Sequence, residues 1–171
     1  MQDMSPATHD IVAYTDQLEV SGQVSAFPPR RLLDLLNNPQ TPYLLIEKAS
    51  VLPLARWGES SPSTAENIVL NKSEVAFVWL VRETEVEVDE FVTVHKVPQQ
   101  VIIYTGPFVA QGILHIIRER TISQALDAVR EPFVALTDPS VLCLSVEGLA
   151  LRGAIVCCIN KDRIMAVQAS E

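Results

Sequence analysis

Short apolar runs separated by turn residues recur along the chain and predict a β-rich protein. The runs "IVAYT" from Ile11 and "VIIYT" from Val101 are typical of strands, and a two-residue turn follows each. The next strand in each half contains a glycine, Gly22 or Gly112, near its middle. A glycine inside a strand indicates a bulge or a sharp bend, so we expect both strands to curve.

One short helix is expected after each glycine-containing strand. In 121–131, Thr121 and Gln124 have the capping-box spacing. Residues 28–39 predict the first helix, and both helices should run for two to three turns. The apolar stripes expected to face the sheet are Leu32, Leu35 and Leu36 in the first helix, and Ile122, Ala125, Leu126 and Val129 in the second.

Two more strands complete each half, and an Asn-Lys pair interrupts the last apolar stretch. The pairs are Asn71-Lys72 and Asn160-Lys161. Asparagine favours turns because its side chain bonds nearby backbone amides, so the pairs predict a turn or bulge between short strands, or a bend in one strand. A contact with a ligand or partner is the alternative interpretation.

The two halves read as an internal duplication. Residues 10–54 align with 100–144 without a gap and share 10 identities in 45 pairs. We therefore expect an α+β, β-rich fold made of two tandem repeats related by a pseudo-twofold axis. Each repeat would be a small curved antiparallel sheet or a partly open barrel with one short helix. The expected divisions are an N-terminal tail (1–9), repeat 1 (10–82), a connecting acidic segment (83–99), repeat 2 (100–168) and a C-terminal tail (169–171).

The connecting segment alternates acidic and apolar residues. Glu83, Glu85, Glu87 and Asp89 would share one face of a strand. We expect a solvated edge strand that its charges protect from pairing. An acidic strip for a basic partner or a divalent ion is the alternative.

Composition narrows the function classes. The formal net charge is −8, whereas nucleic-acid binders usually carry excess Lys and Arg, so nucleic-acid binding is not expected. No stretch reaches the roughly 20 apolar residues of a membrane span, so no membrane insertion is expected. The first ten residues lack a secretory pattern, and Cys143, Cys157 and Cys158 fit reduced core thiols, which favours the cytoplasm.

Catalytic and cofactor motifs are not visible. His9, His95 and His115 do not have metal-ligand spacing, and no glycine-rich phosphate loop occurs. We expect no catalytic residue, no metal and no cofactor, and therefore a protein that is not an enzyme.

Four arginines and two tryptophans remain as candidate contact residues. The arginines Arg30, Arg31, Arg118 and Arg120 precede the predicted helices, where backbone amides favour anions. They would contact a phosphate-bearing ligand or an acidic partner, or lie solvated at the sheet edge. Trp57, in a polar loop, and Trp79, in an apolar strand, are candidate interface residues.

The bent glycine strand, the Asn-Lys turn and the final strands "VAFVWL" and "IMAVQA" loosely resemble Sm-like and SH3-like small barrels. The pattern is also similar to small bacterial β-rich domains that imply no activity. The leading expectation is a non-catalytic interaction or scaffold module of the bacterial cytoplasm, which contacts a protein partner or itself through strand edges and loop–helix faces. The alternatives are a sensor of small anionic ligands or nucleotides, and an RNA-binding barrel.

Overall fold

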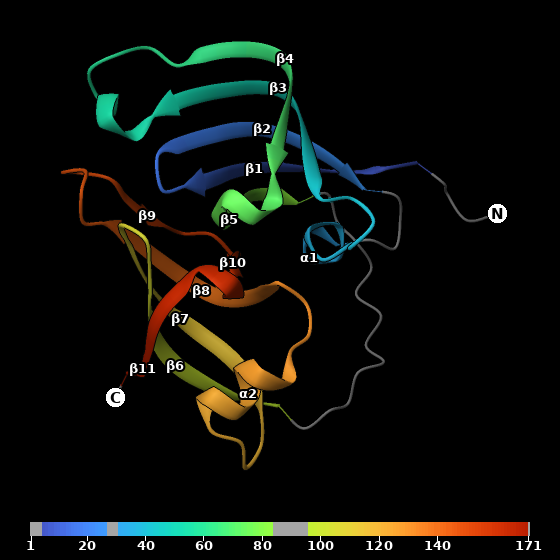
Figure 1. Cartoon of the computed structure of the whole chain (residues 1–171), viewed down its shortest axis with the longest axis vertical. Coiled ribbons are helices and arrows are strands. Elements are labelled where there is room, and N and C mark those ends of the chain that lie inside the picture. Colours follow the sequence, from blue (N-terminus) through green and yellow to red (C-terminus); the bar gives the residue numbers. More distant parts are fainter. Residues whose placement is uncertain (1–4, 27–30, 84–95, 171) are drawn as a thin grey trace. The chain divides into compact units, whose positions relative to one another are not determined.

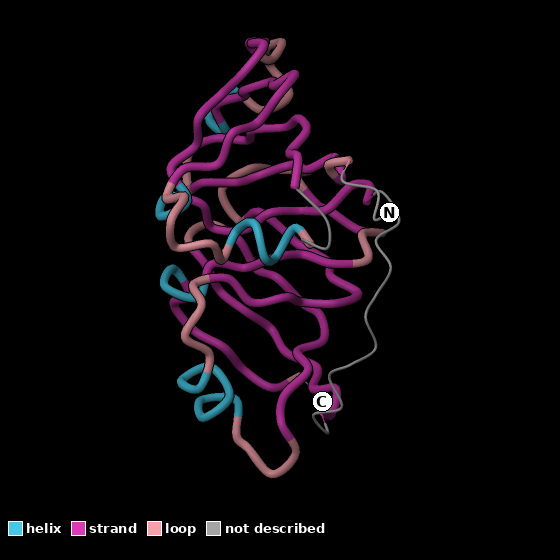
Figure 2. The backbone as a smooth tube through the Cα atoms, turned by 90° about the vertical axis from the view of Figure 1, so that its right-hand side faces the viewer, coloured by secondary structure: helices cyan, strands magenta, loops and turns pink. Residues whose placement is uncertain are grey.

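The chain divides into two β-rich units. The computed structural model describes residues 5–26, 31–83 and 96–170. Unit 1 is Met1–Glu87 and unit 2 is Val88–Glu171. Strands dominate both units, as the tube in Figure 2 shows, so the β-rich prediction is confirmed. Of the acidic connector, Glu85, Glu87 and Asp89 lie outside the described residues.

Unit 1 is an antiparallel sheet with one short helix (Figure 1). Its strands follow the order β5-β1-β2-β3-β4. Its elements are β1 (Ala7–Thr15), β2 (Leu18–Ala26), α1 (Leu32–Leu36), β3 (Tyr43–Pro53), the 3-10 turn η1 (Leu54–Arg56), β4 (Ser63–Asn71), the 3-10 turn η2 (Lys72–Glu74) and β5 (Val75–Glu83).

Unit 2 has the strand order β11-β6-β7-β8-β10, and β9 adds to β8. Both units therefore place their last strand beside their first, followed by the second and third strands. At the position of β4, unit 2 has the shorter strands β9 and β10. The elements are β6 (Lys96–Thr105), β7 (Phe108–Ile117), α2 (Ile122–Ala128), β8 (Phe133–Cys143), β9 (Ala150–Arg152), β10 (Val156–Asn160), the 3-10 turn η3 (Lys161–Arg163) and β11 (Ile164–Ala169).

The sheet of each unit is open. Within the described part of unit 1, the strand pairings run from β5 to β4 and do not return to their start. The coarser expectation, a curved antiparallel arrangement with one short helix, therefore describes the unit. The helices are shorter than predicted, with 5 residues in α1 and 7 in α2. The predicted capping box of Thr121 and Gln124 is confirmed, with the Gln124 N–H donating to Thr121 Oγ1 over 3.2 Å.

Glycine is required at Gly22 because β2 crosses β3 closely there. A Cβ at this position would lie 2.5 Å from Ile46 Cγ2 and 2.6 Å from the Glu47 carbonyl oxygen. Gly112 is in the same situation on β7, where a Cβ would lie 2.7 Å from Leu136 Cγ. The β2–β3 and β7–β8 registers shift next to these glycines, which identifies the bend that the sequence predicts.

The core of unit 1 is built on β1 and β5. Tyr14 and Phe77 stack with ring centroids 4.8 Å apart, and both side chains are buried. Such an offset aromatic pair adds about 0.5–1.5 kcal/mol beyond its buried area. In unit 2 the three free cysteines are buried, as expected for core thiols.

Replacing Gly22 tests the close approach of β2 to β3. We expect Gly22→Ala to lower the free energy of unfolding by about 1–3 kcal/mol, because the added methyl group collides with backbone as well as side-chain atoms. Urea denaturation measures the change. Ser25→Ala, at an exposed position of the same strand, is the matched control and should stay within about 0.5 kcal/mol. Equal effects of the two substitutions would contradict the proposed contact.

Candidate functional site

Both Asn-Lys pairs form the same 3-10 turn between two strands. Asn71 Oδ1 accepts a hydrogen bond from the Ser73 N–H over 3.0 Å. Asn160 Oδ1 accepts one from the Asp162 N–H over 3.1 Å. Each asparagine therefore caps its turn, and the predicted turn between short strands is confirmed.

The lysine of each pair contacts the C-terminal end of the helix in its own unit. Lys72 Nζ donates to the Leu35 carbonyl over 2.7 Å and to Thr41 Oγ1 over 3.0 Å. Lys161 Nζ donates to the carbonyls of Leu126 and Val129 in and after α2. The last carbonyls of a helix have no intrahelical partner and carry partial negative charge, so an ammonium group stabilises them.

The backbone N–H of each lysine bonds to a proline just before the next strand of its unit. The Lys72 N–H donates to the Pro42 carbonyl over 3.0 Å, and the Lys161 N–H donates to the Pro132 carbonyl over 2.6 Å. Each proline directly precedes the next strand, β3 or β8. One residue thus joins the turn, the end of the helix and the start of a strand in its unit.

The side chain of Lys72 is buried, and its burial changes the pKa of the ammonium group. Only 7% of its surface is exposed, and desolvation lowers the pKa of its ammonium group from the ordinary value of 10.5. Lys161 is half-buried and Asn160 is buried, while Asn71 is half-buried. The functional groups of these four candidate contact residues bond within their own units, which fits a structural role.

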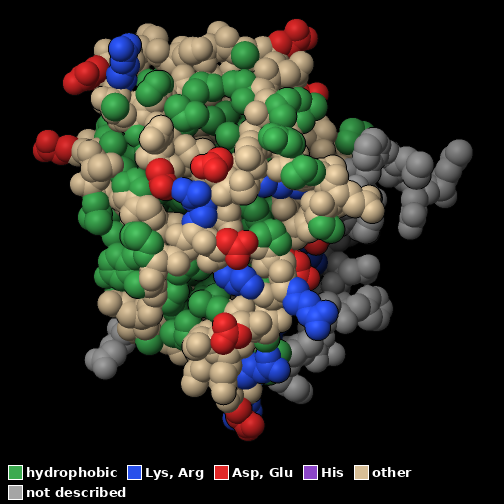
Figure 3. Space-filling model, in the orientation of Figure 1, with side chains coloured by type: hydrophobic (Ala, Val, Ile, Leu, Met, Phe, Trp, Pro, Cys, Tyr) green, Lys and Arg blue, Asp and Glu red, His purple; other side chains and the backbone are tan. Residues whose placement is uncertain are grey.

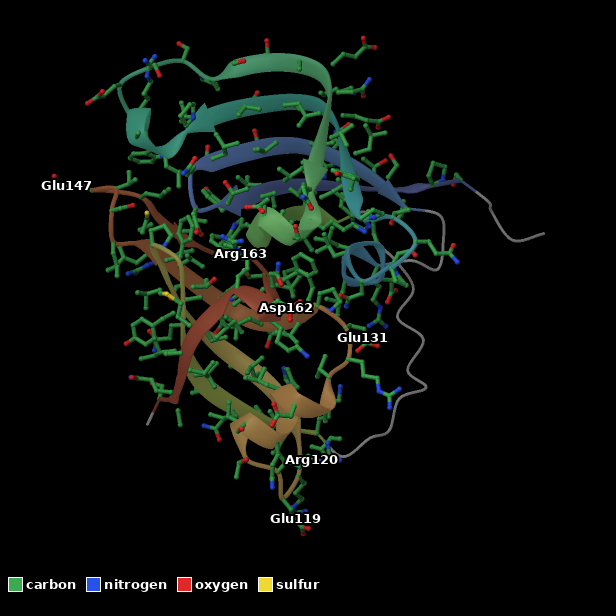
Figure 4. The ribbon with its side chains drawn as sticks, viewed as in Figure 1. Glu119, Arg120, Glu131, Glu147, Asp162 and Arg163 are labelled. Carbon is green, nitrogen blue, oxygen red and sulfur yellow. The ribbon has the colours of Figure 1, made fainter. Side chains whose placement is uncertain are left out.

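The candidate anion-binding arginines are spread over exposed loops. Arg31 is exposed next to α1, and its backbone N–H donates to Asp34 Oδ2 over 3.0 Å. Arg118 and Arg120 are exposed in the turn before α2; Figure 4 labels Arg120 beside Glu119 there. Arg30 lies outside the described residues. Helices of 5 and 7 residues offer little aligned dipole, so the geometry of the described arginines gives no support to an anion site.

The two tryptophans have different environments. Trp79 is 6% exposed in β5, where it lies opposite Val12 of β1. Trp57 is half-buried at the end of η1. Trp79 is therefore a core residue of the chain, and Trp57 retains a partly accessible ring.

An exposed apolar surface lies on the β3–β4 hairpin. Tyr43 is 55% exposed, Leu45 52% and Val69 63%. Val69 is directly opposite Leu45 in the antiparallel register, and Tyr43 lies two residues before Leu45, so the three side chains share one face. We call these three residues the β4 surface. Figure 3 shows apolar side chains among charged ones on one face of the molecule.

This surface could not be located from the sequence. The run "YLLI" at 43–46 is apolar on both faces, because Leu44 and Ile46 are buried while Tyr43 and Leu45 are exposed. A continuous apolar run is typical of a strand covered on both sides, so nothing in it marks an open face. The only available signal was the polar sequence of β4 before Ile68.

The described residues hold no cluster of metal-binding side chains, and the Cys157 thiol is not activated. No group of three or more His, Cys, Asp or Glu side chains there is arranged to hold a metal ion. Burial raises the pKa of the Cys157 thiol well above its ordinary value, and the neighbouring Cys158 raises it further. A thiol that stays protonated is a poor nucleophile. His115 Nε2 lies 3.0 Å from Thr137 Oγ1 on the sheet of unit 2.

Comparisons with known proteins give no relative for this chain. No family model, no curated protein and no solved structure matches it. Within residues 5–26, 31–83 and 96–170, no helix is long and apolar enough to cross a membrane.

Removing the ammonium group of Lys72 tests its structural role. We expect Lys72→Ala to lower the free energy of unfolding by about 1–3 kcal/mol, because buried carbonyls lose a charged donor. Lys161→Ala should have a smaller effect, because Lys161 is more exposed. Chemical denaturation measures both, with the exposed Lys96→Ala as control. A Lys72→Ala protein as stable as the Lys96→Ala protein would refute the role.

The lowered pKa of Lys72 also predicts a pH effect. Between its folded pKa and 10.5 the unfolded chain binds more protons at this residue than the folded chain does, so stability from this group rises with pH. Lys72→Met cannot titrate and serves as the reference. We expect the stability of the wild type relative to Lys72→Met to increase as the pH rises toward 10.5 in denaturation experiments. A constant or falling difference would show that the pKa is not lowered.

Proposed function

We propose that the protein is a non-catalytic protein-interaction or scaffold module that acts through the edge strand β4 and the β4 surface. The observation that carries this proposal is the exposure of Tyr43, Leu45 and Val69, each more than half accessible on one face of the hairpin. Contiguous exposed apolar side chains are costly in water and typically indicate interaction sites.

The backbone beside this surface adds a second mode of contact. β4 pairs with β3 along one side, and along the other its described residues pair with no strand. An incoming strand would bond this edge, and its side chains on the same face would pack beside Val69, as in recognition by strand addition. Backbone bonds supply affinity in this mode, and contacts with the exposed apolar side chains supply selectivity.

We infer further that the two units are tandem copies of one ancestral unit, each an opened small barrel of the Sm-like or SH3-like kind. Shared details support the inference. Gly22 and Gly112 lie at corresponding bends, and Lys48 and Asp138 both adopt φ of 49° in the bulge opposite. The two lysine contacts with helix ends are a further shared feature. A duplication explains such agreement more simply than independent origin.

The exposed apolar surface favours protein interaction over the other two candidate functions. A net charge of −8 opposes binding to RNA phosphates, and the described arginines are dispersed rather than convergent. Three free buried thiols fit a reducing compartment, so we propose that the module acts in the cytoplasm.

Photo-crosslinking in cells tests the proposed module. A benzophenone amino acid at Leu45 or Val69 should form adducts with protein, because a partner covers these side chains. The same amino acid at Glu147, an exposed loop residue of unit 2, is the control. Adducts at the two β4 positions and few at the control would support the proposal, whatever the mass of the partner. Equal, background labelling at all three positions would refute it.

A further inference from the structure

We propose that the partner is a second copy of this chain, and that the β4 surface of one copy packs against the edge strand β11 of the next. The inference rests on the proposed function, because it names the occupant of the same surface. It follows from a comparison of residues that have the same place in the two units.

The residues of unit 2 that correspond to the β4 surface are buried. The pairing registers place Phe133 opposite Asn160 and Cys158 opposite Ala135, as Tyr43 is opposite Asn71 and Val69 opposite Leu45. Phe133 is 2% exposed and Cys158 is 1% exposed, whereas Tyr43 and Val69 are 55% and 63% exposed. The same strand position is therefore covered in one unit and open in the other.

The last strand shows the opposite difference. All six residues from Val75 to Leu80 in β5 are buried. In β11, at the corresponding place of unit 2, Met165 is 67% exposed, and Ala166, Gln168 and Ala169 are exposed too. In unit 1 the last strand is thus buried and the β4 surface is exposed, whereas in unit 2 the equivalent of the β4 surface is buried and the last strand is exposed.

These open surfaces differ from one another, so contact between them is heterologous. A contact that joins two unlike surfaces runs head to tail, and it builds a ring where the rotation closes and a filament where it does not. Each chain would use both surfaces at once, one toward each neighbour.

Neither edge carries the usual protection against pairing. Natural edge strands are commonly blocked by Lys, Pro or inward charges. β11, Ile164–Ala169, contains no charged residue and no proline. β4, Ser63–Asn71, contains a single charge, Glu66, and no proline. Both edges are therefore suited to accept a strand.

Complementation between two blocked chains tests the arrangement. Val69→Lys blocks the β4 surface, and Met165→Lys blocks β11. Leu144→Lys introduces the same charge at a position that is also 67% exposed, outside both surfaces. Light scattering after size exclusion gives the molar mass of each full chain, and thermal unfolding shows that each variant is folded.

We expect the wild type and Leu144→Lys to have at least twice the mass of one chain at high concentration. Val69→Lys and Met165→Lys alone should be monomers. Their equimolar mixture should form a dimer and nothing larger, because each chain retains one open surface. A wild type that stays monomeric at several hundred micromolar overturns the inference.

A Met165→Lys chain that assembles like the wild type while Val69→Lys does not would also overturn it, in favour of a contact between two β4 surfaces. Crosslinks from Val69 to a different protein, together with a monomeric wild type, would refute self-assembly but leave the proposed interaction module standing.

Discussion

The contact of a lysine with the end of a short helix, buried in unit 1 and half-buried in unit 2, is the constraint on which each unit depends. Lys72 follows β4 directly, and only Ser73 and Glu74 separate it from the start of β5, so its position determines where β5 begins. The pairing of β5 with β1 places Val78 opposite Ala13 and Phe77 opposite Tyr14. Because side chains alternate along a strand, a slip of one residue at the turn would move every β5 side chain to the other face and take Phe77 away from Tyr14. Because Lys72 is bonded to the end of α1, the position of this short helix helps to set the register of β5 on β1.

The sequence predicted the features that arise from local patterns. Strand order along the chain, the bends at Gly22 and Gly112, and the Thr121 cap all follow from neighbours within a few residues. The partner of Lys72 could not be predicted, because Leu35 lies 37 residues away and no local pattern links an ammonium group to a distant carbonyl. The helices were predicted too long for a related reason: an apolar stripe indicates where a helix packs, but the contacts at its end determine where it stops.

The β4 surface could not be recognised in the sequence, because its residues are as apolar as those of a buried core. Tyr43 and Leu45 alternate with Leu44 and Ile46, and the sequence does not show that one side of this strand lacks a cover. The arginines and the Asn-Lys pairs attracted attention because charged and polar residues stand out in an apolar sequence. In the structure the lysines stabilise the fold, and the accessible apolar residues are the ones without a distinctive motif.

The two units differ most in their last strands, β5 and β11. β5 has six buried apolar residues from Val75 to Leu80, whereas β11 has Gln168 and small alanines at corresponding places. The elements that shape the fold, namely the bend, the cap and the lysine contact, are kept in both. β4 and β11 each stand at the end of a strand order, with no strand paired along one side among the described residues, so their side chains can change with little effect on the strands behind them, and new contacts can develop there. One heterologous contact of a few side chains is weak, but a closed ring gives every chain two such contacts, and the contact that closes the ring is intramolecular, with no further loss of translational freedom. In the proposed assembly a closed ring is therefore more stable than an open chain of the same number of copies, which favours a small, discrete complex over an open filament, while a single contact still joins two chains at high concentration.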